Sequence, residues 1–306
     1  MGILSKWAES LDYEYEILNN CTRHQSPRSS CERCLAVCDK EAISLENNIP
    51  VIHKDKCIEC GNCISICPVQ AVAGIFPKRS YIEDQLVVTD DYIPTMRELL
   101  VLYKRGLKSI ISEDSSLLEN WAQPIEEANG KLKQLGEDPF VIAVKPIASE
   151  EVSYSRRELF SYWNKETKSI VKHITPAKWR FNQEDFNLEK YYKNYQFAKI
   201  AVNLETCTLC KACQKLCERN CFTITDDEFC ISPQACSSCQ LCVDTCPEHA
   251  IQIEEHISPA TAAITNVIYN KQCENCGKTY QTLRADDGKC VMCTKQSSLL
   301  KEHNFI

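Results

Sequence analysis

The spacing of the cysteines constrains this chain more than any other feature of its sequence. Between Cys31 and Cys67 the pattern is C-x2-C-x3-C, then eighteen residues, then C-x2-C-x2-C-x3-C-P. The same pattern returns 179 residues later, so each of the seven cysteines has a counterpart. The counterparts are Cys210, Cys213, Cys217, Cys236, Cys239, Cys242 and Cys246. The repeat predicts two copies of one small domain whose fold is decided by its cysteines.

The number of cysteines favours metal binding in a reducing compartment. The chain has 22 cysteines in 306 residues, a length that can bury a core without disulfide staples. Met1–Leu18 mixes charged with apolar residues, unlike a signal region, and no stretch has eighteen consecutive apolar residues. We therefore expect a cytoplasmic protein with no membrane span, in which clustered cysteines are metal ligands.

The charge pattern bears on the partners. The net charge of −7 argues against a surface that neutralises nucleic-acid phosphates, so we expect no nucleic-acid partner. Acidic and basic residues balance from Cys21 to Phe76, whereas the net charge from Cys207 to Glu255 is −5. The acidic second repeat predicts a redox partner protein with a basic docking surface.

Both repeats resemble the two-cluster bacterial ferredoxins, in a polyferredoxin-like duplication. A C-x2-C-x2-C loop gives three thiolates to one face of a cubane cluster, and the fourth comes from the other motif. The family's proline follows as Pro68 and Pro247, and its small residue as Ala71 and Ala250. The resemblance implies four [4Fe–4S] clusters. Their ligand sets would be Cys21, Cys31, Cys34 and Cys67; Cys38, Cys57, Cys60 and Cys63; Cys207, Cys210, Cys213 and Cys246; and Cys217, Cys236, Cys239 and Cys242.

One ligand breaks the pattern of the repeat. The position equivalent to Cys207 is Arg28, and Cys21 lies seven residues earlier, as a seven-residue insertion would place it. Cys21 is therefore the predicted fourth ligand of the first set. Two alternatives stay open, namely a free Cys21 thiol beside a three-iron cluster, and ligation by His24 within the insertion.

The linkers between the motifs support the same fold. Short strands are expected on both sides of an Asx-type turn, at Asn47-Asn48 in the first repeat and at Asp226-Asp227 in the second. Two cysteines remain outside the ligand sets: Cys221 stands where the first repeat has Ala42, and Cys230 where it has Val51. Because those partners are small and apolar, we expect both cysteines to pack in a core.

A third cysteine group follows the second repeat. Two C-x2-C pairs, thirteen residues apart, resemble the knuckles of a zinc ribbon. The predicted metal ligands are Cys273, Cys276, Cys290 and Cys293. Four thiolates suit one tetrahedral Zn ion. Rubredoxin-type Fe, which uses the same ligands, is the alternative.

The middle of the chain contains no cysteine from residue 77 to 206. Strands are expected at 85–89, 108–112 and 140–145, with helices over 94–105 and 115–135 that end at Gly106 and Gly136; Pro124 is expected to interrupt the second helix. This β-α-β-α-β order predicts a small parallel sheet. With no G-x-G-x-x-G motif, we interpret the segment as a scaffold rather than a nucleotide site.

The predicted fold class is α+β, with two ferredoxin-like modules flanking a small βαβαβ domain, followed by a zinc ribbon. The expected domains are a first two-cluster module at 1–76, a cysteine-free α/β domain at 77–150, a helical aromatic-rich linker at 151–198, a second two-cluster module at 199–258, and a zinc ribbon with a tail at 259–306.

The function that follows is electron transfer. We expect an iron–sulfur subunit or dedicated redox partner in a hetero-oligomeric oxidoreductase complex, without a catalytic site of its own. Two alternatives belong to other classes. One is a zinc-binding regulatory or assembly scaffold, which the crossed three-plus-one ligand pattern disfavours. The other is an enzyme that uses the clusters to supply electrons to an active site in the middle domain.

Overall fold

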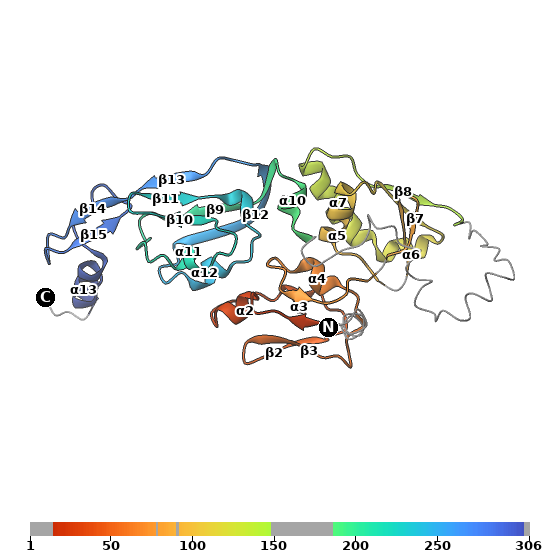
Figure 1. The fold of residues 1–306 in the computed structure, drawn as a ribbon, viewed down its shortest axis with the longest axis horizontal. Coiled ribbons are helices and arrows are strands. Elements are labelled where there is room, and N and C mark those ends of the chain that lie inside the picture. The colour runs from red at the N-terminus through yellow and green to blue at the C-terminus, as the bar shows by residue number, and fades with distance from the viewer. Residues whose placement is uncertain (1–14, 78, 90–91, 148–185, 303–306) are drawn as a thin grey trace, which may run out of the picture. The chain divides into compact units, whose positions relative to one another are not determined.

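The computed structural model describes residues 15–77, 79–89, 92–147 and 186–302 (Figure 1). The chain divides into two compact units. The first unit comprises Met1–Cys21 and Glu32–Tyr191, and the second comprises Thr22–Cys31 and Tyr192–Ile306. Among the described residues, no helix is both long enough and apolar enough to cross a membrane.

In the first unit, the first repeat folds into short strands and helices of one turn around its cysteine loops. These elements are β1 (Glu16–Ile17), α3 (Arg33–Ala36), β2 (Ile43–Glu46), β3 (Ile49–Ile52), α4 (Asn62–Ile66) and β4 (Val72–Ala73). Strand β1 pairs antiparallel with β4, and β2 with β3. Asn47 and Asn48 connect β2 to β3 with φ angles of 50° and 68°, as a two-residue hairpin turn requires.

The free edge of the β2–β3 hairpin carries a proline. Pro50 lies opposite Leu45, and the amide of His53 donates to the carbonyl of Ala42 at 2.8 Å. Because hydrogen-bonded pairs alternate along an antiparallel ladder, position 50 directs its backbone nitrogen away from β2, toward the outer edge. Proline has no N–H there, so this edge lacks a donor that another strand would need.

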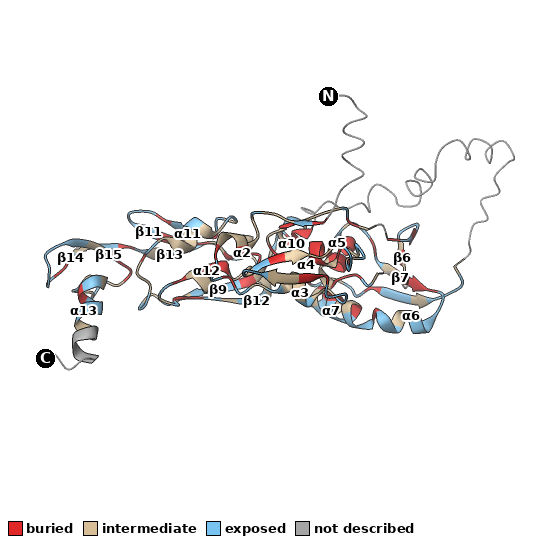
Figure 2. Ribbon diagram, turned by 90° about the horizontal axis from the view of Figure 1, so that it is seen from below, coloured by how far each residue is buried: buried red, intermediate tan, exposed pale blue. Residues whose placement is uncertain are grey.

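The middle segment forms a four-stranded sheet with two longer helices. Its elements are β5 (Tyr81–Ile82), β6 (Gln85–Val87), α5 (Met96–Lys104), β7 (Ser109–Ser112), α6 (Ser115–Asn120), α7 (Ala122–Gln134), β8 (Val141–Val144) and, after the residues that are not described, α10 (Leu188–Tyr191). The strand order is β5-β6-β7-β8, with β6, β7 and β8 parallel and β5 antiparallel to β6. Residues Glu98–Tyr103 of α5 are all buried, as the red segment of Figure 2 shows.

The break in the second predicted helix lies before Pro124 rather than at it. Helix α6 ends at Asn120, Trp121 is the residue between the helices, and α7 begins at Ala122. Pro124 is therefore in the first turn of α7, where a helical amide has no intrahelical partner and its loss costs little. Helices α5 and α7 are each followed by a glycine with positive φ, 108° at Gly106 and 69° at Gly136.

Most of the predicted aromatic-rich linker falls in residues 148–185, outside the described residues. One aromatic that is described, Phe186, is fully buried in the first unit. Its ring centroid lies 4.8 Å from that of Phe76, at the end of the first repeat. This contact packs the segment before α10 against the first repeat.

The second unit contains the second repeat and the C-terminal cysteine pairs. Its elements are α2 (Thr22–Gln25), β9 (Tyr195–Val202), α11 (Ala212–Leu216), β10 (Phe222–Ile224), β11 (Glu228–Ile231), the 3₁₀ turn η3 (Pro233–Ala235), α12 (Leu241–Thr245), β12 (Ile251–Pro259), β13 (Ile264–Val267), β14 (Tyr269–Gln272), β15 (Thr279–Thr282) and α13 (Val291–Glu302). Strand β9 pairs with β12, β10 with β11, and β14 with β15, all antiparallel.

In the second repeat, another strand covers the hairpin edge that Pro50 protects in the first. Phe229, the counterpart of Pro50, lies opposite Asn266 on β13, which extends the β10–β11 hairpin to three strands. The turn also differs from the expected Asx type, because the hydroxyl of Thr225 accepts from the amides of Asp227 and Glu228 at 3.4 and 3.0 Å. The two repeats thus protect the same sheet edge by different means.

Candidate metal centres

The backbone of the cysteine loops turns sharply around the sulfurs. In three of the four loops, the residues just before and just after the middle cysteine have positive φ. These pairs are Glu59 and Gly61, Leu209 and Lys211, and Ser238 and Gln240. Left-handed residues in such loops direct successive N–H groups toward one centre, which suits an anionic cluster. In the fourth loop, Glu32 after Cys31 has a φ of −129°, so the set with the sequence break also has a different backbone.

The second ligand set of the first repeat lines one cavity. Cys38, Cys57, Cys60 and Cys63 all border a space of about 220 Å³. Burial, followed by the neighbouring thiols, raises the pKa of the Cys63 thiol well above its usual range. Four thiols around one cavity are costly to ionise together unless a cation compensates their charge. The donor set therefore fits the cationic core of a metal cluster, which becomes anionic once four thiolates bind it.

A backbone amide donates to a ligand sulfur at four equivalent places. In each case the donor lies four residues after a cysteine. Cys38 and Cys217 are the last cysteines before the linker of each repeat, and Cys67 and Cys246 are the last cysteines of each repeat. The pairs are Ala42 to Cys38 at 3.3 Å, Ala71 to Cys67 at 3.2 Å, Cys221 to Cys217 at 3.5 Å and Ala250 to Cys246 at 3.3 Å. Because all four donor residues are buried, only a small side chain fits beside each sulfur.

The first set of the second repeat also borders a common space. Cys207, Cys210, Cys213 and Cys246 line a cavity of about 20 Å³, closed by apolar neighbours that include Phe229. Burial and then the neighbouring Cys207 raise the pKa of the Cys213 thiol to about 12. The set is thus partly desolvated, as a cluster site requires.

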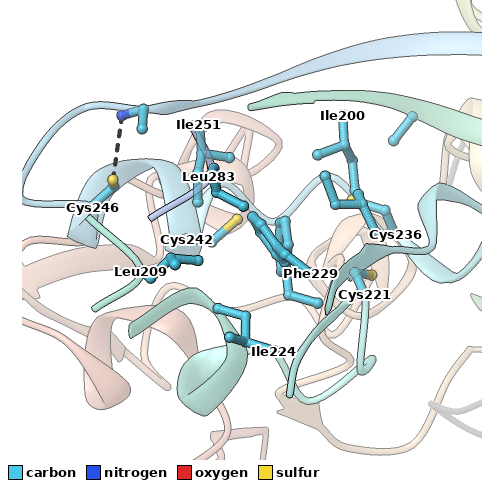
Figure 3. Close-up of a cluster of buried hydrophobic side chains, with 14 of the residues drawn as sticks. Ile200, Leu209, Cys221, Ile224, Phe229, Cys236, Cys242, Cys246, Ile251 and Leu283 are labelled. Carbon is cyan, nitrogen blue, oxygen red and sulfur yellow. Dashed lines mark hydrogen bonds between the residues drawn. The ribbon is translucent and has the colours of Figure 1, made fainter. Parts of the chain in front are cut away.

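In the other set of the second repeat, Cys217, Cys236, Cys239 and Cys242, the thiols affect one another's pKa values. Burial and then Cys236 and Cys217 raise the pKa of Cys239 to about 11. Burial, followed by Cys239 and Cys236, raises the pKa of Cys242 well above its usual range. The Cys217 thiol differs, because a side-chain hydrogen bond from Cys221 lowers its pKa to about 6. Cys236 and Cys242 belong to the buried core of the unit, where Figure 3 labels them, and Cys217 packs against that core.

The set that contains the sequence break stays a prediction. Cys67 is buried, while Cys21 and Cys34 are half-buried in the first unit. Cys31 belongs to the second unit, as does His24, whose Nε2 atom is buried without a hydrogen-bond partner among the described residues. Both alternatives for the fourth ligand, Cys21 and His24, therefore stay open.

The C-terminal cysteines form a tight tetrad. The sulfurs of Cys273, Cys276, Cys290 and Cys293 all lie within 4.8 Å of one another, with 3.9 Å between Cys276 and Cys290. A Zn–S bond of about 2.3 Å in a tetrahedron gives sulfurs separated by about 3.8 Å. Hydrogen bonds from the backbone amides of Cys290 and Cys276 lower the pKa of Cys273 to about 6, which favours the thiolate that metals bind.

The short distances between the four sulfurs of the tetrad distinguish it from the motif cysteines. In the part of the chain that the structure describes, no other group of three or more cysteine, histidine or carboxylate side chains is gathered as closely. The cavity that the Cys38 set borders, at about 220 Å³, is larger than one tetrahedral ion fills. That set therefore fits a cluster of several metal ions better than a single zinc ion.

Two side chains distant in sequence from the motifs lie beside the Cys38 set. The Tyr15 hydroxyl donates to the carbonyls of Glu59 and Ile75, at 3.0 and 2.8 Å. Arg79 has a favourable electrostatic effect on the Cys60 thiolate. Nothing in the cysteine spacing indicates either residue, because their proximity arises only from the packing of the chain.

The two cysteines outside the ligand sets have different environments. Cys221 lies in the buried core, as predicted from Ala42, and its backbone amide donates to the sulfur of Cys217 at 3.5 Å. The prediction for Cys230 is wrong: its sulfur is 3.6 Å from the Thr265 hydroxyl on the outer face of β11. Side chains alternate along a strand, and the core face of β11 is taken by Phe229 and Ile231.

Comparisons with known proteins agree with the cysteine chemistry. Residues 28–71 match a family described as a 4Fe-4S dicluster domain. An uncharacterized ferredoxin from Methanocaldococcus jannaschii is 41% identical over 44 residues, which cover 14% of this chain and 29% of that protein. A polyferredoxin protein from Methanothermobacter marburgensis is 32% identical over 97 residues, covering 29% of this chain and 23% of that protein.

These matches span less than a third of either relative's own length. They support ferredoxin-type 4Fe–4S domains in this chain, and with them an iron–sulfur electron-transfer role. The remaining features of the function are proposals.

Proposed function

We propose that the chain carries four [4Fe–4S] clusters and one zinc ion, and that it transfers electrons as an iron–sulfur subunit or dedicated redox partner of a cytoplasmic oxidoreductase complex. The observation that carries the proposal is the placement of Cys38 with Cys57, Cys60 and Cys63 around one cavity. This is the three-plus-one ligand pattern that shared cubane motifs require. The second repeat supports it with Cys246 beside Cys207, Cys210 and Cys213.

The bound clusters would supply one-electron chemistry, and the described residues would hold and tune them. Cysteine loops would bind the clusters, and backbone amides such as that of Ala42 would donate to ligand sulfurs. Burial of Cys63, Cys67, Cys236, Cys242 and Cys246 limits the access of water to part of each ligand set. Since neither task involves proton transfer to a substrate, the role needs no acid–base residue.

The zinc ribbon would have a structural role in the second unit. Arg284 pairs with Glu205 at 2.9 Å, and Lys295 with Glu248 at 2.6 Å. Each acidic partner lies two residues from a ligand of the Cys207 set. Leu283 contributes to the core of the same unit. The zinc ion would stabilise the small domain that contains the β14–β15 sheet. The two ion pairs would then hold this domain against the loops of the Cys207 set.

Metal analysis of the full chain tests the proposal. Anaerobically purified protein should contain about sixteen irons, sixteen sulfides and one zinc per chain. About fifteen irons with a three-iron electron paramagnetic resonance signal would show that Cys21 is not a ligand. Metal content dominated by zinc would instead support the scaffold function, and bound flavin would support a cluster-fed enzyme.

The acidic turn of the second repeat is the proposed docking surface. Asp226 and Asp227, in the turn between β10 and β11, and Glu228, the first residue of β11, are all exposed. We expect that reversing their charges to lysine slows electron transfer to a basic partner and weakens its dependence on salt.

A matched control reverses three exposed glutamates of the middle segment, Glu119, Glu126 and Glu127. It changes the net charge equally but leaves the turn intact. If both triple variants slow transfer equally, the effect comes from net charge and the docking surface is wrong.

A further inference from the structure

Two glutamates of the second repeat lie close to ligands of the Cys207 set. Glu205 comes two residues before Cys207, and Glu248 comes two residues after Cys246. A turn keeps Glu248 near its cysteine, since the amide of His249 donates to the carbonyl of Cys246 at 3.2 Å. Glu248 also lines the small cavity that Cys207 and Cys246 border. A carboxylate therefore stands beside the site of this predicted cluster.

The C-terminal ribbon supplies a cation to each of these glutamates. Nη1 of Arg284 lies 2.9 Å from Oε2 of Glu205, and Nζ of Lys295 lies 2.6 Å from Oε1 of Glu248. All four side chains line one cleft of about 220 Å³, which Cys207 also borders. The Glu248 side chain is 20% exposed and that of Glu205 is 74% exposed, so water screens the charge of Glu248 less.

The cysteine tetrad determines where Lys295 lies. Lys295 follows Cys293, a member of the tetrad, by two residues on α13. Leu283 of the ribbon belongs to the same buried core as Leu209 and Ile251 of the second repeat, and Figure 3 labels all three. The tetrad and this core contact together hold the Lys295 ammonium group beside Glu248.

Charges beside an iron–sulfur cluster shift its reduction potential. The cluster with four thiolates is anionic, and one electron from the redox partner makes it more negative. A neighbouring carboxylate therefore lowers the potential, and a cation that offsets the carboxylate raises it again. In the first repeat the counterpart of Glu248 is Val69, so the carboxylate occurs in the repeat that the ribbon contacts.

We propose that the zinc ribbon raises the reduction potential of the cluster in the Cys207 set, by holding Lys295 against Glu248 and Arg284 against Glu205. The inference rests on the proposed function, because it requires both that cluster and the zinc ion. Loss of zinc releases the two cations from the glutamates and lowers this one potential. The ribbon thereby couples the occupancy of the zinc site to the redox properties of a neighbouring cluster.

The test is a redox titration of the full chain, loaded anaerobically and followed by electron paramagnetic resonance. Lys295→Gln should lower one reduction potential by an amount that corresponds to about a threefold smaller equilibrium constant, or about 28 mV for one electron. Glu248→Gln breaks the same ion pair but removes the negative charge, so it should raise that potential by a similar amount. Lys295→Arg keeps the cation and should preserve the potential.

Lys278→Gln is the matched control. Lys278 is exposed and also follows a tetrad cysteine by two residues, but it does not line the cleft. The control removes the same charge and should move no potential. Cys276→Ser, which should release the zinc, is expected to lower the same potential as Lys295→Gln does.

The proposal is overturned if Lys295→Gln and Glu248→Gln shift the potential in the same direction, because the ion pair would then act only through the position of the loop. It is also overturned if neither variant shifts it, if Lys278→Gln shifts it as far as Lys295→Gln does, or if zinc release leaves every potential unchanged. An unmodified chain that lacks the clusters or the zinc would instead refute the proposed function, and metal analysis shows this before any titration.

Discussion

Replacing Glu98 by glutamine should destabilise the middle of the first unit strongly. Arg79 binds Glu98 through two hydrogen bonds of 2.8 Å, and their side chains are 3% and 0% exposed. Burial alone would lower the pKa of Arg79, but the Glu98 carboxylate keeps it above its ordinary value. The guanidinium also lies 5.5 Å from the ring centroids of Phe76 and Tyr92. Glu98→Gln would therefore leave the Arg79 guanidinium charged and buried without its carboxylate partner.

The exposure of the pair sets the size of the effect. Removing one partner of a buried ion pair costs about 3 to 5 kcal/mol, because the other charge stays buried. The pair between Lys104 and Glu137 is a matched control in the same unit, since its side chains are 30% and 27% exposed. Glu137→Gln should cost about 0.2 to 1 kcal/mol. The double variant Arg79→Met/Glu98→Leu buries no charge and should be more stable than Glu98→Gln.

Hydrogen exchange of the α5 amides measures the effect locally. Leu99–Leu102 are fully buried, so their exchange reports the opening of this region. A loss of 3 to 5 kcal/mol corresponds to about two to four orders of magnitude in protection, since 1.4 kcal/mol is tenfold. If Glu98→Gln changes protection no more than Glu137→Gln does, or if the double variant is the least stable, the reasoning about buried charge is refuted.

Three further predictions concern the loops and helices. Gly61→Ala should remove about four irons, because the φ of Gly61 is +80° and the new Cβ would lie 2.5 Å from Pro77. Full iron content in this variant would contradict the prediction. The control is Gly277→Ala, which should keep all its iron, since Gly277 has a φ of +70° and its new Cβ would meet no atom within 4 Å. Cys276→Ser should release the zinc and leave the iron unchanged, as measured by metal analysis, whereas a fall in iron would place this cysteine in a cluster site. Gly130→Ala should stabilise α7 by about 0.4 to 1 kcal/mol in thermal unfolding, because its Cβ meets nothing within 4 Å and its φ is not positive.

Local patterns were the part of the fold that could be predicted. The hairpins lie where Asn47-Asn48 and Asp226-Asp227 indicated turns, and the helices of the middle segment stop beside Gly106 and Gly136. These turn residues and glycines could be recognised because each one determines the backbone conformation at its own position or at a neighbouring position. The position of the helix break at Trp121 was missed, because proline in a first turn does not interrupt a helix.

Contacts between distant residues were the part that could not be predicted. Cys221 and Cys230 were both predicted to pack in a core, because each aligns with a small apolar residue of the first repeat. Cys221 does lie in the core, whereas Cys230 lies on the outer face of its sheet. Cys230 faces outward because Phe229 and Ile231 take the core face of β11, and its neighbour on that outer face is Thr265 of β13, 35 residues away. No spacing rule within the motif contains that strand.

The sequence by itself determined which cysteines can act together, because loop spacing controls which sulfurs reach a common centre and the 179-residue repeat supplies the equivalences. Tertiary structure alone decided what surrounds them. The ion pair of Arg79 with Glu98 and the burial of Cys221 beside the sulfur of Cys217 depend on packing and the absence of water. Those quantities belong to the folded chain as a whole, so a one-dimensional pattern of residues does not contain them.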